Sequence, residues 1–482
     1  MGNRVAIVGG GLAGLAAAVA LTGRGLAVAL LESRPRWGGR ASSFVDQATS
    51  EAIDNCQHVA LGCCTNFLQF CHAVGIQKHF ECERLLTFVG PDGRTSALSA
   101  SPLPAPLHLF PSFAGMRFLS WGEKLRLALG VRALARTDPE ECADETFLHW
   151  LQRHRQPPAV IDRFWHVVLV SALSETLDRL DVGHARKVIV DGFLRNRQGW
   201  EVWVPTVPLD DLYGTVVQNW LETQGVTCRL QSGVRRVVPT GARSSISGKA
   251  EDATAPFEIE LRSSEKLQAD HVILAVPQNL VAGLLPEEYR QLPEIACLDR
   301  LETAPISSVH LWFDRPITTL RHATIVGRLS QWLFNRSAIH RTNDTPHGTR
   351  DGSYYQVVIS ASRDVVASAQ GEIVAQVVDE LKAFCPLARD AKLLHSRLVT
   401  EHKAVVSMLP GVDRNRPGQG SSIGGLYLAG DWTLTGWPGT MEGAVRSGYL
   451  AAEQLLRSRG TPATLLQPDL PTARLSRWLL GL

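Results

Sequence analysis

The sequence Val-Ala-Ile-Val-Gly-Gly-Gly-Leu-Ala-Gly-Leu-Ala-Ala-Ala-Val-Ala-Leu, at residues 5–21, decides the fold of this chain. A short apolar strand leads into Gly9, Gly11 and Gly14, and an alanine-rich helix follows. Gly9 permits a tight turn, Gly11 lets the backbone approach a pyrophosphate, and Gly14 lets helix and strand pack closely. Leu12 and Ala13 begin the helix, whose free N–H groups and positive dipole end favour phosphates. The stretch predicts a Rossmann-like α/β domain that binds an ADP-containing cofactor.

A second apolar run ends at Glu32, about where a βαβ unit places the carboxylate that binds a ribose hydroxyl. An ordinary surface glutamate is the alternative. A Gly-Gly-Arg turn follows at residues 38–40, and its glycines would again let the backbone come close to a charged ligand; a simple basic turn is the alternative there. The cofactor contacts predicted from this region are Glu32, Ser33, Arg34, Gly38, Gly39 and Arg40.

The far end of the chain carries a matching segment. A short strand at residues 426–429 leads to Gly430 and Asp431, and a loop containing Pro438 opens a helix from about residue 442 to residue 456. This helix could direct its dipole at the cofactor, and Asp431 could accept hydrogen bonds from ribityl or ribose hydroxyls. A capping or turn aspartate is the alternative. The predicted contacts are Gly430, Asp431, Trp437, Gly439, Thr440, Met441, Glu442 and Ala444.

Together, the two ends resemble the flavin-dependent amine oxidase and carotenoid desaturase superfamily. The resemblance spans the whole chain and implies FAD rather than NAD, bound by a Rossmann-like domain of the GR2 type beside an α+β substrate domain. It also implies that Val234 packs against the adenine. Residues 433–441 contain no cysteine, so the covalent flavin arrangement of some relatives is absent, and FAD is expected to bind non-covalently.

The FAD-binding domain must be discontinuous because its signatures lie at opposite ends of the chain. We place it at residues 1–75, 200–275 and 390–460. The substrate domain then comprises residues 76–199 and 276–389, and residues 461–482 form a C-terminal tail. The polar stretch from residue 240 to residue 256 is typical of a surface hairpin loop.

A closer resemblance lies within that superfamily. Residues 54–66, 165–173, 331–336 and 357–362 are similar to segments of the hydroxysqualene dehydroxylases, the squalene-associated FAD enzymes of bacterial hopanoid pathways. This resemblance implies reductive removal of an allylic hydroxyl from hydroxysqualene, which yields squalene. The substrate would be a C30 isoprenoid, and a tunnel lined by Phe, Trp and Leu is expected.

Loss of the hydroxyl as water requires a general acid, and an incipient allylic cation must be shielded from water. The candidate acids are Asp54 and His58, which follow the Gly-Gly-Arg turn. We expect a strand there, which would place both side chains on one face. Hydrogen-bonded structural residues are the alternative for each. Asp191, Asn335 and Arg336 are weaker candidates.

Two further functions compete with the leading one. A carotenoid- or phytoene-type desaturase would run the redox reaction in the opposite direction on a similar polyprenyl chain. Carriers of the Rab-escort and GDP-dissociation-inhibitor type share the fold but bind prenyl lipids without flavin catalysis. Amine oxidation is disfavoured because the strand at residues 307–313 lacks the lysine of that branch, and Ser308 lies about where it would fall.

The composition excludes several other classes. The chain has 482 residues, 45% of them hydrophobic and 20% charged, which is typical of a globular protein of two or three domains. A net charge of +2 does not indicate binding to nucleic acid. The nine cysteines contain no C-x-x-C pair and indicate neither a zinc site nor a redox dithiol, so no metal is expected. The glycine-rich motif starts too early for a leader, and no apolar run could span a membrane. A cytoplasmic protein with reduced cysteines is expected.

Residues 101–136 are a candidate membrane contact. Basic side chains lie there beside Phe110, Phe113, Phe118 and Trp121, a pattern that suits an interfacial helix on anionic lipid. A packed helix with a solvated face is the equal alternative. The tail at residues 475–480 is either a second contact or a frayed end. The expected location is therefore the cytoplasm, with contact at the inner face of the cytoplasmic membrane as the further hypothesis.

Overall fold

A computed structural model of the chain describes residues 2–240, 256–340 and 353–482. The fold is α/β, and its centre is a parallel five-stranded sheet in the order β10-β2-β1-β14-β20. The strands come from distant parts of the chain: β10 (Thr227–Arg229), β2 (Ala27–Leu31), β1 (Arg4–Val8), β14 (His271–Leu274) and β20 (Leu426–Leu428). The two ends of the chain thus meet in one sheet.

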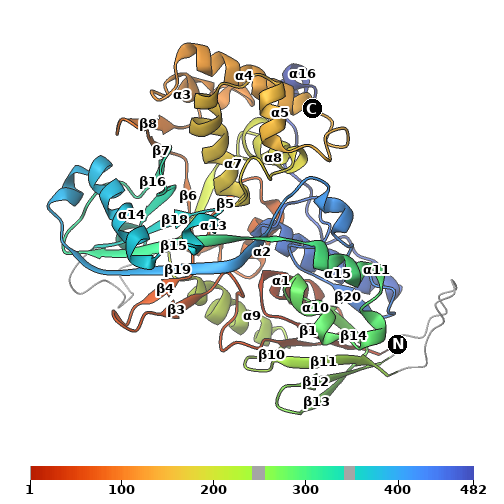
Figure 1. Cartoon of the computed structure of the whole chain (residues 1–482). Helices are drawn as coiled ribbons and strands as arrows, with labels where there is room; N and C mark the ends of the chain where they lie inside the picture. The colour runs from red at the N-terminus through yellow and green to blue at the C-terminus, as the bar shows by residue number, and fades with distance from the viewer. Residues whose placement is uncertain (1, 241–255, 341–352) are drawn as a thin grey trace.

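Helices α1 (Leu12–Leu21) and α15 (Met441–Ser458) pack against each other beside this sheet (Figure 1). Small side chains allow the close approach, because a Cβ atom on Gly448 would lie 2.3 Å from the carbonyl oxygen of Ala13. Ser447 also accepts a hydrogen bond of 2.8 Å from the Gly430 N–H. Helices α2 (Thr65–Ala73) and α9 (Val217–Thr223) pack nearby, and α9 continues a π-helical turn at Asp210–Val216.

An antiparallel three-stranded sheet packs beside the parallel sheet. Its strands are β11 (Val234–Pro239), β12 (Phe257–Leu261) and β13 (Lys266–Ala269). The hairpin loop expected at residues 240–256 falls almost entirely on residues 241–255, outside the described residues.

A seven-stranded sheet forms the second large unit, in the order β19-β15-β18-β17-β16-β7-β8. Helix α14 (Gln370–Phe384) covers one face, where its apolar side chains pack on those of β15. The strands are β19 (Leu393–Val406), β15 (Thr303–Phe313), β18 (Ser353–Ile359), β17 (Trp332–Asn335), β16 (His322–Ile325), β7 (Leu86–Val89) and β8 (Thr95–Leu98).

Short elements join the two units. A hairpin pairs β3 (Ser43–Val45) with β4 (Ala52–Asp54), and a small sheet orders β5 (Ala60–Leu61), β9 (Val202–Pro205) and β6 (Phe80–Glu83). The connecting helices are α10 (Gln278–Leu284), α11 (Pro293–Ala296), α12 (Arg336–Ile339) and α13 (Arg363–Val366).

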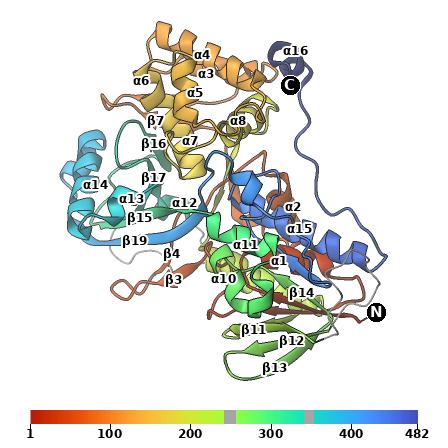
Figure 2. The same cartoon turned by 45° about the vertical axis from the view of Figure 1, so that its right-hand side comes forward.

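A helical cap lies at the top of the molecule in Figure 1. Its helices are α3 (Phe110–Ala114), α4 (Trp121–Arg136), α5 (Phe147–Arg153), α6 (Pro158–Val160), α7 (His166–Leu173) and α8 (Val182–Ile189). Residues 461–473 run from α15 up to this cap without helix or strand, and α16 (Arg474–Leu480) docks on α4 (Figure 2). The tail is therefore not a frayed end.

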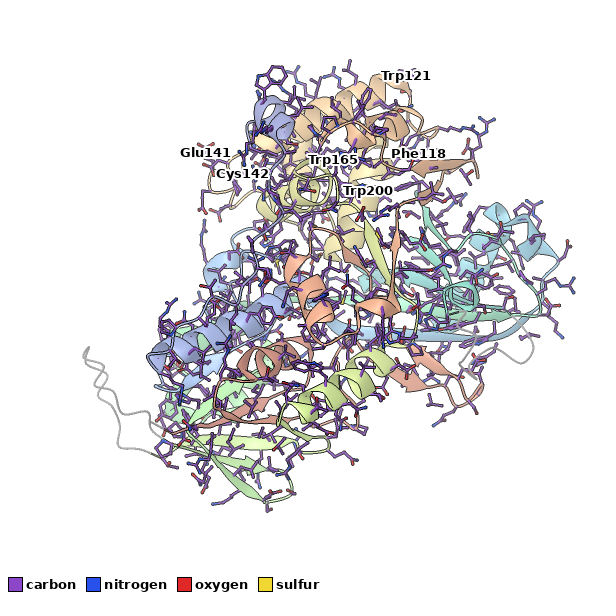
Figure 3. All side chains as sticks on the ribbon, turned by 180° about the vertical axis from the view of Figure 1, so that it is seen from behind. Phe118, Trp121, Glu141, Cys142, Trp165 and Trp200 are labelled. Atoms are coloured by element: carbon purple, nitrogen blue, oxygen red, sulfur yellow. The ribbon has the colours of Figure 1, made fainter. Side chains whose placement is uncertain are left out.

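The membrane-contact hypothesis needs two corrections within the cap. Phe118 is buried and packs beside Phe88 with 6.2 Å between ring centroids, so it faces the core and not a lipid surface. Lys124 is also buried and donates a 2.7 Å hydrogen bond to the carbonyl oxygen of Ala114. Trp121 is exposed at the outer edge of the cap, whereas Trp165 lies inside it (Figure 3). No helix in the described part of the chain is long and apolar enough to cross a membrane.

Candidate active site

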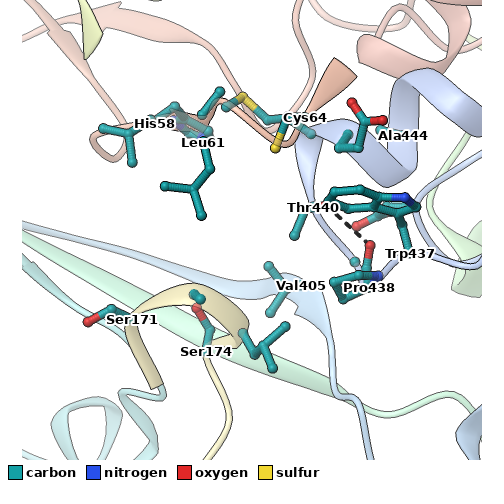
Figure 4. A pocket seen from close by; sticks show the side chains of 18 of the residues that line it. His58, Leu61, Cys64, Ser171, Ser174, Val405, Trp437, Pro438, Thr440 and Ala444 are labelled. Carbon is teal, nitrogen blue, oxygen red and sulfur yellow. Dashed lines mark hydrogen bonds between the residues drawn. The ribbon is translucent and has the colours of Figure 1, made fainter. Parts of the chain in front are cut away.

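A cavity of about 1070 Å³ runs from the glycine turn after β1 to the helical cap. Every predicted cofactor contact except Gly14 contributes to its wall. Figure 4 shows the loop of His58, Leu61 and Cys64 on one side of this space and Ser171 and Ser174 on the other. The half away from the glycine turn is mostly apolar. Its wall comes from the helical region of the cap and from β7 and β17, and includes Leu86, Phe88, Leu109, Phe113, Met116, Leu127, Val131, Phe164, Val167, Phe193, Leu194, Trp332 and Phe334.

The glycine turn has the geometry that a phosphate site requires. Gly9 has a φ of +112°, and a Cβ atom there would lie 2.4 Å from the carbonyl oxygen of Ala275. A Cβ atom on Gly14 would lie 1.9 Å from the carbonyl oxygen of Gly9, which explains why Gly14 packs the helix on the strand without reaching the cavity. Gly11 begins α1 without a side-chain cap and lines the cavity. The helix therefore presents unpaired N–H groups to this space.

Glu32 follows β2 and lies at the cavity wall, but its carboxylate already has several donors. Oε2 accepts a 2.7 Å hydrogen bond from the Gly10 N–H, and Oε1 accepts hydrogen bonds from the Arg34 N–H at 2.7 Å and the Ser33 hydroxyl at 3.0 Å. An ionised carboxylate has about four acceptor positions. Glu32 thus holds the glycine turn in shape and keeps capacity for one more donor.

An ion pair joins the Gly-Gly-Arg turn to the C-terminal segment. Arg40 Nη2 lies 2.5 Å from Asp431 Oδ1, and Arg40 Nη1 donates to the carbonyl oxygen of Ala404 at 2.6 Å. Gly38 takes a φ of +87°, and its N–H donates to the Gly10 carbonyl, which brings the two glycine turns together. Arg40 and Asp431 both line the cavity. This ion pair joins two segments that lie near opposite ends of the sequence, and it closes the cofactor end of the cavity.

The start of α15 lies at the same wall. Thr440 caps the helix by accepting a 3.2 Å hydrogen bond from the Gly443 N–H. The Glu442 carboxylate, in contrast, turns to the start of α2, where it accepts from the N–H groups of Asn66 at 3.2 Å and Phe67 at 2.7 Å. Burial raises the pKa of Glu442. Its side chain therefore supports the fold here, and its backbone is the part available to a ligand.

Asp54 does not reach the cavity, contrary to its expected role as an acid. It is buried at the end of β4, where Oδ2 pairs with Arg336 Nη2 at 2.5 Å. Its Oδ1 accepts from the Ser43 hydroxyl at 2.7 Å and the Leu209 N–H at 3.0 Å. Three donors in a buried site hold the carboxylate, and the cavity wall resumes at Asn55. The structural alternative therefore describes Asp54.

His58 lines the cavity, although the strand expected to carry it ends at Asp54. Its Nδ1 lies 2.9 Å from the carbonyl oxygen of Cys56, an acceptor that requires the proton on Nδ1. Burial lowers the pKa of His58. The ring is therefore neutral at neutral pH, with Nε2 as a hydrogen-bond acceptor. The His58 ring can therefore accept a hydrogen bond from a hydroxyl group through Nε2, but it has no proton on that atom to donate.

The comparison with protein families identifies the chain. The model for flavin containing amine oxidoreductase matches residues 12–456. The chain belongs to this family. A 15-cis-phytoene desaturase of Synechococcus elongatus is 25% identical over 96% of this chain and 100% of its own length, and a probable zeta-carotene desaturase of the same organism is 26% identical over 95% and 100%. Among solved structures, cyclohexylamine oxidase from Brevibacterium oxydans has a TM-score of 0.67 at 18% identity and covers 95% of this chain and 100% of its own.

The flavin amine oxidoreductase fold makes FAD the cofactor, and the residues present fit it. The uncapped start of α1 offers N–H groups to a pyrophosphate. The indole Nε1 of Trp437 is buried at the cavity wall with no acceptor among the described residues. Val234 lines the cavity at the start of β11. We take these groups as the contacts that a bound FAD would use.

Several site residues escaped sequence reasoning. Arg416 is buried and donates to the carbonyl oxygens of Asp431, Thr433 and Trp437 at 3.1, 2.7 and 2.7 Å, which shapes the loop before α15. Lys187 and Glu401 line the cavity, and no motif marks either one. Ser308, about where the amine oxidase resemblance implies a lysine, lies on β15, is buried outside the cavity wall and accepts a 2.7 Å hydrogen bond from Gln356.

Proposed function

We propose that this FAD-dependent oxidoreductase reduces hydroxysqualene to squalene by removing the allylic hydroxyl. The observation that carries the proposal is one continuous cavity of about 1070 Å³, which joins the predicted FAD contacts to an apolar space that reaches the helical cap. Ordinary ligand pockets measure roughly 300–1,000 Å³, so this volume suits a dinucleotide with part of a second, extended ligand. A C30 hydrocarbon bearing one hydroxyl matches an apolar wall with a few polar groups.

The chain's own residues would bind and orient this substrate. The apolar wall would exclude water from the reacting carbon, and the neutral His58 ring would accept a hydrogen bond from the substrate hydroxyl. When bound in its reduced form, FAD supplies the hydride. The Arg40–Asp431 pair and the first turn of α1 would hold the cofactor against the wall.

The test is a single turnover without oxygen. Purified holoenzyme is photoreduced and mixed with synthetic hydroxysqualene, and the extracted lipids are analysed by mass spectrometry. We expect about one squalene per flavin, together with recovery of the oxidised flavin spectrum. The control is the oxidised holoenzyme, which should leave hydroxysqualene unchanged. If the reduced enzyme forms no squalene, the proposed function is wrong.

A phytoene-type desaturase is the second candidate, and the names of the relatives favour it. Desaturation needs a group that accepts a proton, and the neutral His58 ring could serve. The same preparation separates the two reactions, because oxidised enzyme with phytoene would then bleach the flavin and yield a more conjugated product. The third candidate, a prenyl-lipid carrier without flavin, is disfavoured because the family is one of flavin oxidoreductases.

We also propose that the helical cap rests on an anionic membrane. Trp121, Leu125 and Leu129 are exposed along one face of α4, and Trp478 of α16 is exposed beside them. Phe110 and Arg132 are exposed as well as lining the cavity, so the cavity extends to this surface. An apolar face with arginines around it suits the interface of anionic lipid. A lipophilic substrate could enter there directly.

A further inference from the structure

Lys187 brings an ammonium group to the cofactor half of the cavity. It belongs to α8, and its Nζ lies 4.4 Å from the centroid of the Trp437 ring, in the segment that leads into α15. Asp191 Oδ2 lies 2.8 Å from Nζ, and Asp469 Oδ2 of the C-terminal tail lies 3.7 Å away. Two carboxylates and an aromatic face thus hold a cation at the cavity wall.

The proposed reaction needs a proton at this wall, and most of the other ionisable groups there are held by partners of their own. The arginines do not release protons in proteins. Glu32 and Glu442 accept backbone N–H groups, and Asp431 pairs with Arg40. Burial raises the pKa of Cys56 to about 12, so its thiol is a poor acid. Lys187 is the one lysine among the described residues of the cavity wall.

We propose that Lys187 is the catalytic proton donor to the departing hydroxyl. This inference rests on the proposed function. The C–O bond breaks and its electron pair leaves with oxygen, which takes a proton from Lys187 Nζ and departs as water. The allylic carbon gains the hydride of the reduced cofactor. Lys187 is left as an amine beside Asp191 and Asp469 and recovers its proton from solvent after product release.

Two substitutions separate proton donation from mere positioning. Lys187→Met keeps most of the aliphatic stem and removes the ammonium. Lys187→Arg keeps a positive hydrogen-bond donor that does not release its proton. We expect both to slow flavin reoxidation by hydroxysqualene at least about 100-fold, the usual scale of general acid catalysis. Lys266→Met, on the surface strand β13, should leave the rate unchanged.

Ligand binding gives the readout that does not depend on turnover. Dissociation constants for hydroxysqualene and squalene are measured on the oxidised holoenzyme from changes in its flavin spectrum. Wild type and Lys187→Arg should bind the alcohol about 10-fold more tightly than the hydrocarbon, and Lys187→Met should lose most of this preference, with the His58 contact accounting for the remainder. If wild type shows no preference, the Lys187 proposal fails whether or not squalene is formed.

The competing acid is Glu401, which also lines the cavity. A rate loss in Glu401→Gln combined with full activity in Lys187→Met would overturn the proposal and assign the proton to Glu401. Full activity in Lys187→Arg would reduce Lys187 to a positioning residue. If the wild-type enzyme prefers the alcohol through Lys187 but forms no squalene, the contact stands, while the proton transfer and the proposed function both fall.

Discussion

At the scale of single residues, Gly14 is the glycine with the least room for a side chain in the part of the chain that the structure describes. A Cβ atom there would lie 1.9 Å from the carbonyl oxygen of Gly9, and backbone cannot move aside as a flexible side chain can. We expect Gly14→Ala to separate α1 from β1, shift the phosphate-binding turn and weaken FAD binding at least about 100-fold, which is about 2.7 kcal/mol. Flavin absorbance after gel filtration measures the loss.

The matched control for this prediction is Gly371→Ala in α14. An added Cβ atom at Gly371 would meet no atom within 4 Å, and alanine is the better helix former. This variant should keep its FAD and gain up to about 1 kcal/mol in stability. Normal flavin content in Gly14→Ala would show that the turn tolerates the displacement and that the packing argument is wrong.

The Asp54–Arg336 pair gives the second prediction at this scale. Both side chains are almost fully buried, so removal of one charge leaves the other without its partner. We expect Asp54→Asn to lower the free energy of unfolding by about 3 kcal/mol or more. The rate per flavin-loaded molecule should fall much less, because Asp54 lies outside the cavity. Chemical unfolding and single-turnover rates test the two parts, and a variant of normal stability with a lost rate would restore Asp54 as a catalytic candidate.

At the scale of elements, α4 and α16 together make the exposed apolar face of the cap. Trp121 and Trp478 have exposed fractions of 72% and 77%. We expect the double change Trp121→Ser, Trp478→Ser to reduce binding to vesicles that contain phosphatidylserine by at least about 10-fold, with normal FAD content. Flotation with and without added salt measures it. Equal binding by the double variant would argue that α4 is only a packed helix.

Other elements show which parts of the fold could be predicted from the sequence and which could not. Short-range signals predicted β1, the glycine turn and α1, because the pattern of glycines and apolar residues is local. The prediction of a strand through His58 was wrong, because β4 ends at Asp54. The side chain of Asn55 donates to the carbonyl oxygen of Arg40, and this contact between distant residues directs the chain away from β4. Lys187 and Arg416 reach the site only through tertiary packing, so no local pattern marks them.

At the scale of the whole molecule, stability should depend on pH through buried histidines, and three of them have the largest shifts. Burial lowers the pKa of His108 and His271 to about 4 and that of His310 to about 3. An unfolded histidine titrates near 6.5, so below this pH the unfolded chain binds more protons than the folded one. Stability is therefore fully present above about pH 6.5 and decreases as the pH falls.

The expected size of this effect follows from the same shifts. Between pH 6.5 and pH 5.5, each of these three histidines should lower the free energy of unfolding by about 1 kcal/mol, which gives at least about 3 kcal/mol in total. Urea unfolding of the holoenzyme at several pH values measures it. His310→Gln removes one titrating group and should reduce the loss by about 1 kcal/mol, whereas His402→Gln, at an exposed position, should not change it. A stability that is flat between pH 7.5 and pH 5.5 would mean that these rings stay hydrated and that the packing around β15 is looser than the structure describes.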